Sequence, residues 1–285
     1  MAWLADLIAA DPPRAPGFIV TIYGDVVDPR GGTLWVGTLI DCCAAHGLSE
    51  TLVRTAVSRL VGAGRLIGER IGRRSYYRLT GLAQAEFRAA SATLYARPPE
   101  AQGWLLALRD EAARDADWPP GWARLSAEAA MAPNRPDVEA PGGLVMTAVC
   151  HSKGGDPRGF AARHWPVREV ARAYEGFVAK YGPVAHGLAG AGLTGPSALA
   201  LRLRLVHDYR ASALSDPRLP AAALPADWPG EAAYRIFARV YLALAGAADA
   251  HIGDSFRDSR GSLGCETRET ARRLATLHQG LHANL

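Results

Sequence analysis

Positively charged and hydrogen-bonding side chains are concentrated in one short stretch of the chain, RIGRRSYYRL, which runs from Arg70 to Leu79. It holds four arginines, a glycine, a serine and two tyrosines. Between Ser49 and Thr80 there are seven arginines and two glutamates, so this segment carries a formal charge of +5, against +4 for the whole chain of 285 residues. Guanidinium groups bind phosphate oxygens through paired hydrogen bonds. Such a cluster is typical of a site for a polyanion.

The residues before this stretch predict two short helices separated by a tight turn. The sequence TLWVGTLIDCCAAHG has apolar residues at helical spacing, and Gly47 suits the left-handed position after a helix. Ser49 is then a good N-cap for a helix whose apolar stripe is Leu52, Val53, Ala56, Val57 and Leu60. This is a helix-turn-helix pattern. We predict that the polar face of the second helix contacts DNA through Thr51, Arg54, Thr55, Ser58 and Arg59.

The pattern then changes to that of a β-hairpin. Residues 66–70 and 75–79 are rich in Ile, Leu and Tyr, and a turn at 71–74 joins them. A hairpin directly after a helix-turn-helix predicts a winged helix, whose arginines bind the phosphate backbone or enter the minor groove. The predicted contacts of this hairpin are Arg70, Arg73, Arg74, Ser75 and Tyr76. A winged helix that binds only proteins is the alternative, and the hairpin arginines disfavour it.

One segment gives conflicting signals. Residues 17–27, GFIVTIYGDVV, are β-branched and favour a strand by propensity. A winged helix needs a first helix at this place, to pack behind the recognition helix. We predict a helix, because tertiary packing often overrides propensity.

Proline-containing joints divide the chain into three regions. YARPPEAQG, residues 95–103, ends the first region, and the Gly- and Pro-rich KYGPVAHGLAGAGLTGPS ends the second. The middle region has three strand candidates (GWLLALRD, WARLSAEAAMAPNRP and GGLVMTAVC) followed by a helix, WPVREVARAYEGFVAKYG. The last region predicts helices, among them LALRLRLVHDYR and a long one after Asp227. The fold class is therefore α+β.

Composition excludes several classes of protein. No apolar run reaches the length of a membrane span, and the N-terminus has acidic residues and no basic leader. The cysteines, Cys42, Cys43, Cys150 and Cys265, form no metal-binding spacing and fit free thiols in a reducing compartment. We expect a cytoplasmic protein that does not contact a membrane and has no cofactor.

Several motifs resemble those of a known family. They are IYGD at 22–25, RGGTLWVGTL at 30–39, VRTAVSRL at 53–60, IGRRSYYRL at 71–79 and LVHDYR…DPRLPAAALPADWPG at 205–230. In this order they resemble the PaaX family of bacterial transcriptional repressors. The resemblance implies repression of genes for phenylacetate degradation and release from DNA by phenylacetyl-coenzyme A.

The resemblance also implies the domain architecture. It consists of an N-terminal winged helix-turn-helix (residues 1–97), a ferredoxin-like dimerisation domain (98–185) and a helical C-terminal domain (186–285). The chain departs from the family pattern in the middle: RDADWPPG leaves little room for the usual helix between Arg109 and Trp122. The expected partners are a second copy of the chain and a double-stranded operator with an inverted repeat.

An effector pocket is expected outside the winged helix, because the exposed face of that domain is committed to DNA. Aromatic residues of the C-terminal region suit a phenylacetyl group, and nearby arginines suit the phosphates of coenzyme A. The candidate residues are Arg202, His207, Arg210, Trp228, Tyr234 and Tyr241. Core packing is the competing interpretation of each aromatic, and a buried hydrogen-bonded network is the favoured one for HDYR at 207–210.

Three alternatives remain at this point. A related regulator of another pathway would answer to a different acyl-coenzyme A thioester. A metal-dependent nuclease would use Asp110, which follows a strand, but such enzymes gather several carboxylates around Mg²⁺ and the neighbours here are mostly Ala, Arg and Pro. His278 and His282 share a helix face, yet no third metal ligand accompanies them, so they fit a solvated C-terminus better. We therefore predict no catalytic and no metal-binding residues.

Overall fold

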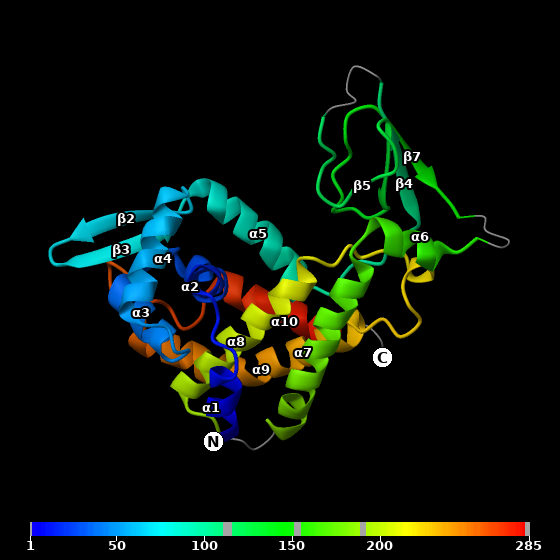
Figure 1. Cartoon of the computed structure of the whole chain (residues 1–285). Helices are drawn as coiled ribbons and strands as arrows, with labels where there is room; N and C mark the ends of the chain where they lie inside the picture. Colours follow the sequence, from blue (N-terminus) through cyan, green and yellow to red (C-terminus); the bar gives the residue numbers. More distant parts are fainter. Residues whose placement is uncertain (1, 111–115, 151–154, 189–191, 283–285) are drawn as a thin grey trace. The chain divides into compact units, whose positions relative to one another are not determined.

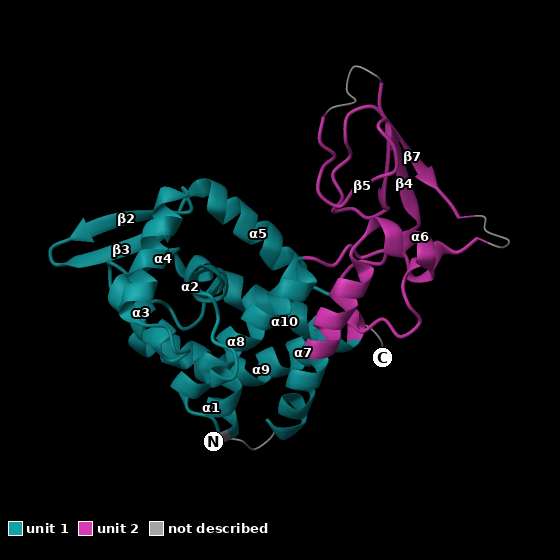
Figure 2. Ribbon diagram, viewed as in Figure 1, with its two compact units in different colours: residues 1–97, 177–214, 232–285 teal, residues 98–176, 215–231 magenta. Residues whose placement is uncertain are grey.

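The computed structural model describes residues 2–110, 116–150, 155–188 and 192–282, and combines helices with two small antiparallel sheets (Figure 1). The α+β class is as predicted. The described residues form two compact units (Figure 2). Unit 1 comprises residues 1–97, 177–214 and 232–285, and unit 2 comprises residues 98–176 and 215–231. The residues after 186 therefore belong mostly to the same unit as residues 1–97, and the division into three domains stays a prediction.

Unit 1 is mainly helical, with one three-stranded sheet. Its elements in chain order are α1 (Ala2–Ala9), α2 (Ala15–Ile22), a π-helical turn η1 (Tyr23–Val27), η2 (Asp28–Arg30), β1 (Thr33–Trp35), α3 (Val36–Ala44), α4 (Glu50–Gly62), β2 (Leu66–Ile71), β3 (Arg74–Leu79), α5 (Gly81–Tyr95), the second half of α7 (Val167–Gly187), α8 (Gly195–Ala213), α9 (Gly230–Ser255) and α10 (Arg268–His282). The sheet order is β1-β3-β2.

The conflicting segment at residues 17–27 is helical, as predicted. α2 runs directly into η1, and Phe18, Ile19, Ile22, Val26 and Val27 are all fully buried. α2 packs against α4 and α8. The β-branched side chains are therefore covered by neighbouring helices, and their burial outweighs the small propensity difference.

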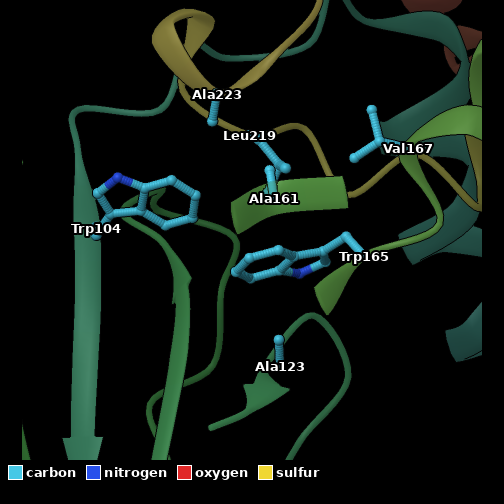
Figure 3. Packing of buried hydrophobic residues seen from close by; sticks show 7 residues of the cluster. All are labelled: Trp104, Ala123, Ala161, Trp165, Val167, Leu219 and Ala223. Carbon is cyan, nitrogen blue, oxygen red and sulfur yellow. The ribbon is translucent and has the colours of Figure 1, made fainter. Parts of the chain in front are cut away.

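Unit 2 contains a four-stranded antiparallel sheet with the order β5-β6-β4-β7. Its elements are β4 (Trp104–Leu108), β5 (Ala123–Arg124), β6 (Ala129–Pro133), β7 (Leu144–Ala148), α6 (Pro157–His164), the first half of α7 and the short helix η4 (Ala221–Ala223). One of its cores gathers around Trp104 and Trp165, whose ring centroids lie 5.4 Å apart (Figure 3). Part of the segment between β4 and β5 lies outside the described residues.

A buried network of charges joins the helices of unit 1. The carboxylate of Asp25 on η1 accepts hydrogen bonds from the hydroxyls of Tyr95 (2.9 Å) and Tyr241 (2.8 Å). It also pairs with Arg202 Nε at 2.9 Å and with Arg273 Nη1 at 3.1 Å. Asp249 extends the network, because it pairs with Arg202 and with Arg30, each at 2.7 Å. One carboxylate thus forms hydrogen bonds or ion pairs with four helices, α5, α8, α9 and α10.

The network keeps its charges at neutral pH. Burial by itself raises the pKa of Asp25, but the guanidiniums of Arg202 and Arg273 and the two hydroxyls outweigh it, so the pKa lies below its usual value. Burial likewise acts to lower the pKa of Arg202, and the carboxylates of Asp25 and Asp249 raise it above the usual value. Each charge is therefore stable only while its partners remain in place.

We predict that Asp25→Ala destabilises the protein by about 3–5 kcal/mol, because it leaves Arg202 and Arg273 buried without this counter-charge. Urea denaturation measures the loss. Since the folded pKa of Asp25 is lowered, its contribution is present above the unfolded pKa of about 4 and disappears as the pH falls below it. The difference in the free energy of unfolding between wild type and Asp25→Ala should therefore become smaller as the pH is lowered through this range.

Glu50→Ala provides the matched control. Its carboxylate pairs with Arg54 at 2.7 Å, but both side chains are more than half exposed. An exposed pair contributes less than about 1 kcal/mol. Equal losses in the two variants would show that the buried network does not hold unit 1 together.

Candidate nucleic-acid interface

α4 presents a polar face to solvent. Ser49 caps the helix by accepting a hydrogen bond from the Leu52 backbone nitrogen at 3.4 Å, and Gly47 has a φ of 75° in the turn before it. On the inner face Val53, Ala56 and Val57 are buried. All five predicted contact residues on the outer face are exposed: Thr51, Arg54, Thr55, Ser58 and Arg59. The helix therefore offers guanidinium and hydroxyl groups along one face.

The apolar stripe predicted for α4 is narrower than expected. Leu52 is 53% exposed and Leu60 is only half-buried. Leu52 lies in the first turn of the helix, at the margin of the face that packs on α2 and α3. Leu52 belongs to the predicted apolar stripe but stays exposed, because residues near the edge of an amphipathic stripe are covered only if a neighbouring element reaches them.

Arg54 has a partner that sequence reasoning missed. Glu50 lies one turn earlier, and its carboxylate accepts a hydrogen bond from Arg54 Nε. The acidic residue stabilises the helix N-terminus and pairs with the guanidinium on the exposed face. Because the pair is exposed, Arg54 can exchange this partner for another acceptor at little cost. The spacing of four residues between Glu50 and Arg54 was the available signal.

The hairpin is formed by β2 and β3 with a two-residue turn, since Ile71 pairs with Arg74. Gly72 has a φ of 61° at the first turn position, a conformation that the turn requires and that other residues rarely adopt. Arg70, Arg73 and Arg74 are exposed, and Ser75 is partly exposed. The turn thus brings three arginines together at its tip.

Trp35 and Tyr76 lie on the sheet that contains this hairpin, and Tyr76 was expected to contact DNA. Tyr76 is only 6% exposed, because it lies on the central strand β3 between Trp35 on β1 and Glu69 on β2. Its burial takes it off the surface that its neighbours present. Trp35 instead contributes to that surface indirectly: the guanidinium of Arg74 lies 4.9 Å from the Trp35 ring centroid. This cation–π contact, which positions Arg74, was not predicted from the sequence.

The candidate effector residues have different surroundings in the structure. Arg202, Tyr234 and Tyr241 are buried in unit 1, and Arg202 and Tyr241 are members of the Asp25 network. Trp228 belongs to unit 2, where it packs beside Tyr174. Only two of the set, His207 and Arg210, are partly exposed in unit 1. The buried members of this set are therefore surrounded by other residues of unit 1.

His207 and Arg210 meet at one hydroxyl. Thr21 Oγ1 lies 2.9 Å from His207 Nδ1 and accepts a hydrogen bond from Arg210 Nη1 at 3.1 Å. Burial lowers the pKa of His207 to about 4, so the imidazole is neutral at pH 7. Asp208, between them in sequence, binds Lys180, Tyr181 and Arg204. The expected hydrogen-bonded network around HDYR is therefore present.

Comparison with known proteins places these features in a family. Residues 14–83, which span α2 to the start of α5, match the PaaX-like protein family, and residues 165–254 match the PaaX-like protein C-terminal domain. The chain is also 30% identical over 280 residues to the transcriptional repressor PaaX of Escherichia coli (strain K12), covering 90% of this chain and 88% of that protein. This chain belongs to the PaaX family. It is accordingly a transcriptional repressor, which binds DNA, and not an enzyme.

Two further observations concern the alternatives to a DNA-binding protein. Asp110 is exposed, and no group of three metal-ligating side chains occurs in the described part of the chain. Among the same residues, no helix is long and apolar enough to cross a membrane. The interface of this PaaX-family protein with DNA is thus best sought on α4 and the β2–β3 hairpin.

We predict that Arg54 reads a base edge in the major groove. Arg54→Ala should then relax specificity at one base pair of each half-site, by about 1–3 kcal/mol, which is the discrimination of a bidentate arginine–guanine contact. Competition binding with an operator recovered from random duplexes and with its single-base variants measures this. Arg239→Ala, which removes an exposed arginine on α9, is the control. Equal weakening on every duplex would instead identify Arg54 as a phosphate contact.

We predict a different result for the hairpin. Arg73→Ala should weaken binding to operator and to random duplex alike, and reduce the slope of log affinity against log salt by about 0.9 for one lost phosphate contact. Fluorescence anisotropy at several salt concentrations gives the slope. A slope equal to that of wild type and of Arg239→Ala would mean that the hairpin tip does not contact the backbone.

Proposed function

We propose that this chain represses genes for the breakdown of phenylacetate or a related aryl acid, and that an acyl-coenzyme A thioester such as phenylacetyl-coenzyme A releases it from its operator. The single observation that carries the DNA-binding part is the joint exposure of the polar α4 face and the arginine-rich hairpin in one unit. The pathway and the effector rest on the resemblance to the PaaX family.

We propose that residues 1–97 form a winged helix-turn-helix. The sheet order β1-β3-β2 supports this, because the strand before α3 pairs with the second strand of the hairpin. α3 and α4 are joined by a turn at Gly47, and the hairpin follows α4 directly. α4 is then the recognition helix, and the β2–β3 hairpin is the wing.

We also propose a ferredoxin-like character and a dimerisation role for unit 2. In sequence order its strands lie second-third-first-fourth, all antiparallel to their neighbours, which is the ferredoxin-like arrangement. The described residues contain no helix in either crossover. β7 is an edge strand, and Leu144 and Met146 on it, with Val149 just after, are 59%, 38% and 75% exposed. An apolar edge of this kind supports pairing with a second copy.

Two copies would read an inverted repeat, since a two-fold protein dimer matches a two-fold operator. One winged helix alone covers few base pairs, so pairing supplies the remaining specificity. The expected complex therefore contains two chains for each operator.

We predict that phenylacetyl-coenzyme A dissociates the operator complex, while free phenylacetate and coenzyme A at the same concentrations do not. Gel-shift titration measures release, and sedimentation of the same mixtures gives the number of chains on the DNA. Release requires a ligand that binds the DNA-free arrangement better, so the thioester should also bind the free protein more tightly than the complex.

The possible outcomes separate the parts of the proposal. Release by another acyl-coenzyme A alone would assign a different pathway and keep the mechanism. A complex that ignores all thioesters would contradict the effector while leaving DNA binding intact. A single chain per operator would contradict the dimer.

A further inference from the structure

A cavity of about 380 Å³ lies wholly within unit 1. Residues of α2, η1, the end of α4, the base of the β2–β3 hairpin, α5 and α8 line it. Most of its wall is apolar, with Ile19, Leu60, Leu66, Phe87, Leu94 and Val206 among the lining residues. Cavities that bind small molecules generally measure about 300–1,000 Å³ and are mostly apolar with a few polar groups. Size and lining therefore suit a compact apolar ligand.

The charged residues in the wall are not equivalent. Asp25 pairs with Arg202 and Arg273, and Glu86 accepts a hydrogen bond from Arg65. Arg210, in contrast, donates to the Gly17 carbonyl oxygen (3.0 Å) and to Thr21 Oγ1, both through Nη1. No carboxylate in the described ranges lies within ion-pair distance of it. Burial lowers the pKa of this guanidinium, so the charge would gain from an acceptor supplied by a ligand.

We propose that this cavity is the effector site, and that it takes an aryl or alkyl acyl group whose oxygen accepts hydrogen bonds from Arg210. The inference rests on the proposed release by a ligand and assigns the residues that perform it. A thioester and a free carboxylic acid share this chemistry, and the binding experiment below separates them. The place differs from the expected one among the C-terminal helices, since only Val206, Arg210 and Leu214 of the lining come from α8 and the residue after it.

The position of the cavity explains how a ligand would act on DNA binding. Leu60 belongs to the last turns of α4, and Leu66 and Leu79 are the hairpin residues farthest from the turn. An occupant therefore contacts the base of both DNA-binding elements at once. We expect the occupant to fit better when α4 and the hairpin are in a relative position that does not match the operator. Binding then shifts the equilibrium away from the position that binds the operator.

The first test fills the cavity. Ala90→Trp places an indole in the wall, since Ala90 on α5 lines the cavity. Ala89→Trp makes the same change at the preceding residue, which is exposed and does not line the cavity. Calorimetry with phenylacetyl-coenzyme A and, separately, with phenylacetate measures binding. Ala90→Trp should weaken the bound probe by at least about tenfold, and Ala89→Trp should leave it unchanged.

The second test removes the charge. Arg210→Met keeps an unbranched apolar side chain, and Arg88→Met changes an exposed arginine of α5 in the same way. We expect about a tenfold loss of probe affinity in Arg210→Met only. Arg210→Met should keep operator affinity without ligand, which shows that it folds, and a thermal unfolding transition like that of wild type shows the same for Ala90→Trp. Both cavity variants should resist release by the ligand.

The outcomes distinguish this inference from the function on which it rests. If phenylacetyl-coenzyme A releases wild type and the two cavity variants equally, the site lies elsewhere and the proposed effector stands. If the thioester has no effect but phenylacetate binds wild type and not Ala90→Trp, the site stands and the thioester assignment falls. If neither probe binds wild type, both assignments fall.

Discussion

The carboxylate of Asp25 is the point on which the arrangement of unit 1 depends. It is fully buried and lies in the π-helical turn that follows α2, where four side chains from α5, α8, α9 and α10 converge on it. A buried carboxylate is stable only if its hydrogen-bonding capacity is filled and its charge is balanced. The helices that supply the partners are separated from Asp25 by 70 to 248 residues in sequence. The network therefore selects one arrangement among those that hydrophobic packing alone would allow.

This constraint has a consequence for the surface that contacts DNA. α2, which leads into η1, packs against α4, so the network also defines the support of the proposed recognition helix. Arginines inside unit 1, such as Arg202 and Arg273, are paired with acids, whereas those at the tip of the hairpin are exposed. Arginine side chains thus have two roles in unit 1, one in the buried network and one on the exposed hairpin. Low dielectric makes it structural inside, and exposure leaves it available to phosphate outside.

The cavity lies between these two regions of unit 1. Asp25 and Tyr95 of the network form part of its wall, and Leu60 and Leu66 of the DNA-binding elements form another part. A ligand there would meet the rigid network on one side and the base of the hairpin on the other. Because disturbing the Asp25 network would cost much free energy, we expect a ligand to displace α4 and the β2–β3 hairpin on the opposite side of the cavity. The proposed effector site therefore lies next to the elements proposed to bind the operator.

The sequence by itself determined the local elements and the chemistry of the DNA-binding surface. Periodicity, the Ser49 cap and the glycines at 47 and 72 are local signals, so α4 and the hairpin were predicted with nearly correct bounds. The helix predicted from Thr33 begins only at Val36, because Thr33–Trp35 form β1, which pairs with the distant strand β3. The density of positive charge is also a local signal, and it led to the prediction that the hairpin arginines contact DNA. The structure corrected Leu52 and Tyr76, because the burial of a side chain depends on which distant element covers it.

Only the tertiary structure decided what the polar residues of the last region do. Arg202 and Tyr241 were candidate ligand contacts from their type, and the structure shows both hydrogen-bonded to Asp25. Nothing in the sequence near Asp25 shows that its partners come from α8, α9 and α10, since hydrogen bonds across more than a hundred residues leave no periodic pattern. The cavity is likewise formed by seven elements, α2, η1, α4, β2, β3, α5 and α8, that meet only in the folded chain. Spacing along the chain predicts which face of a helix or strand a residue lies on. Only the tertiary packing determines which residues that face contacts.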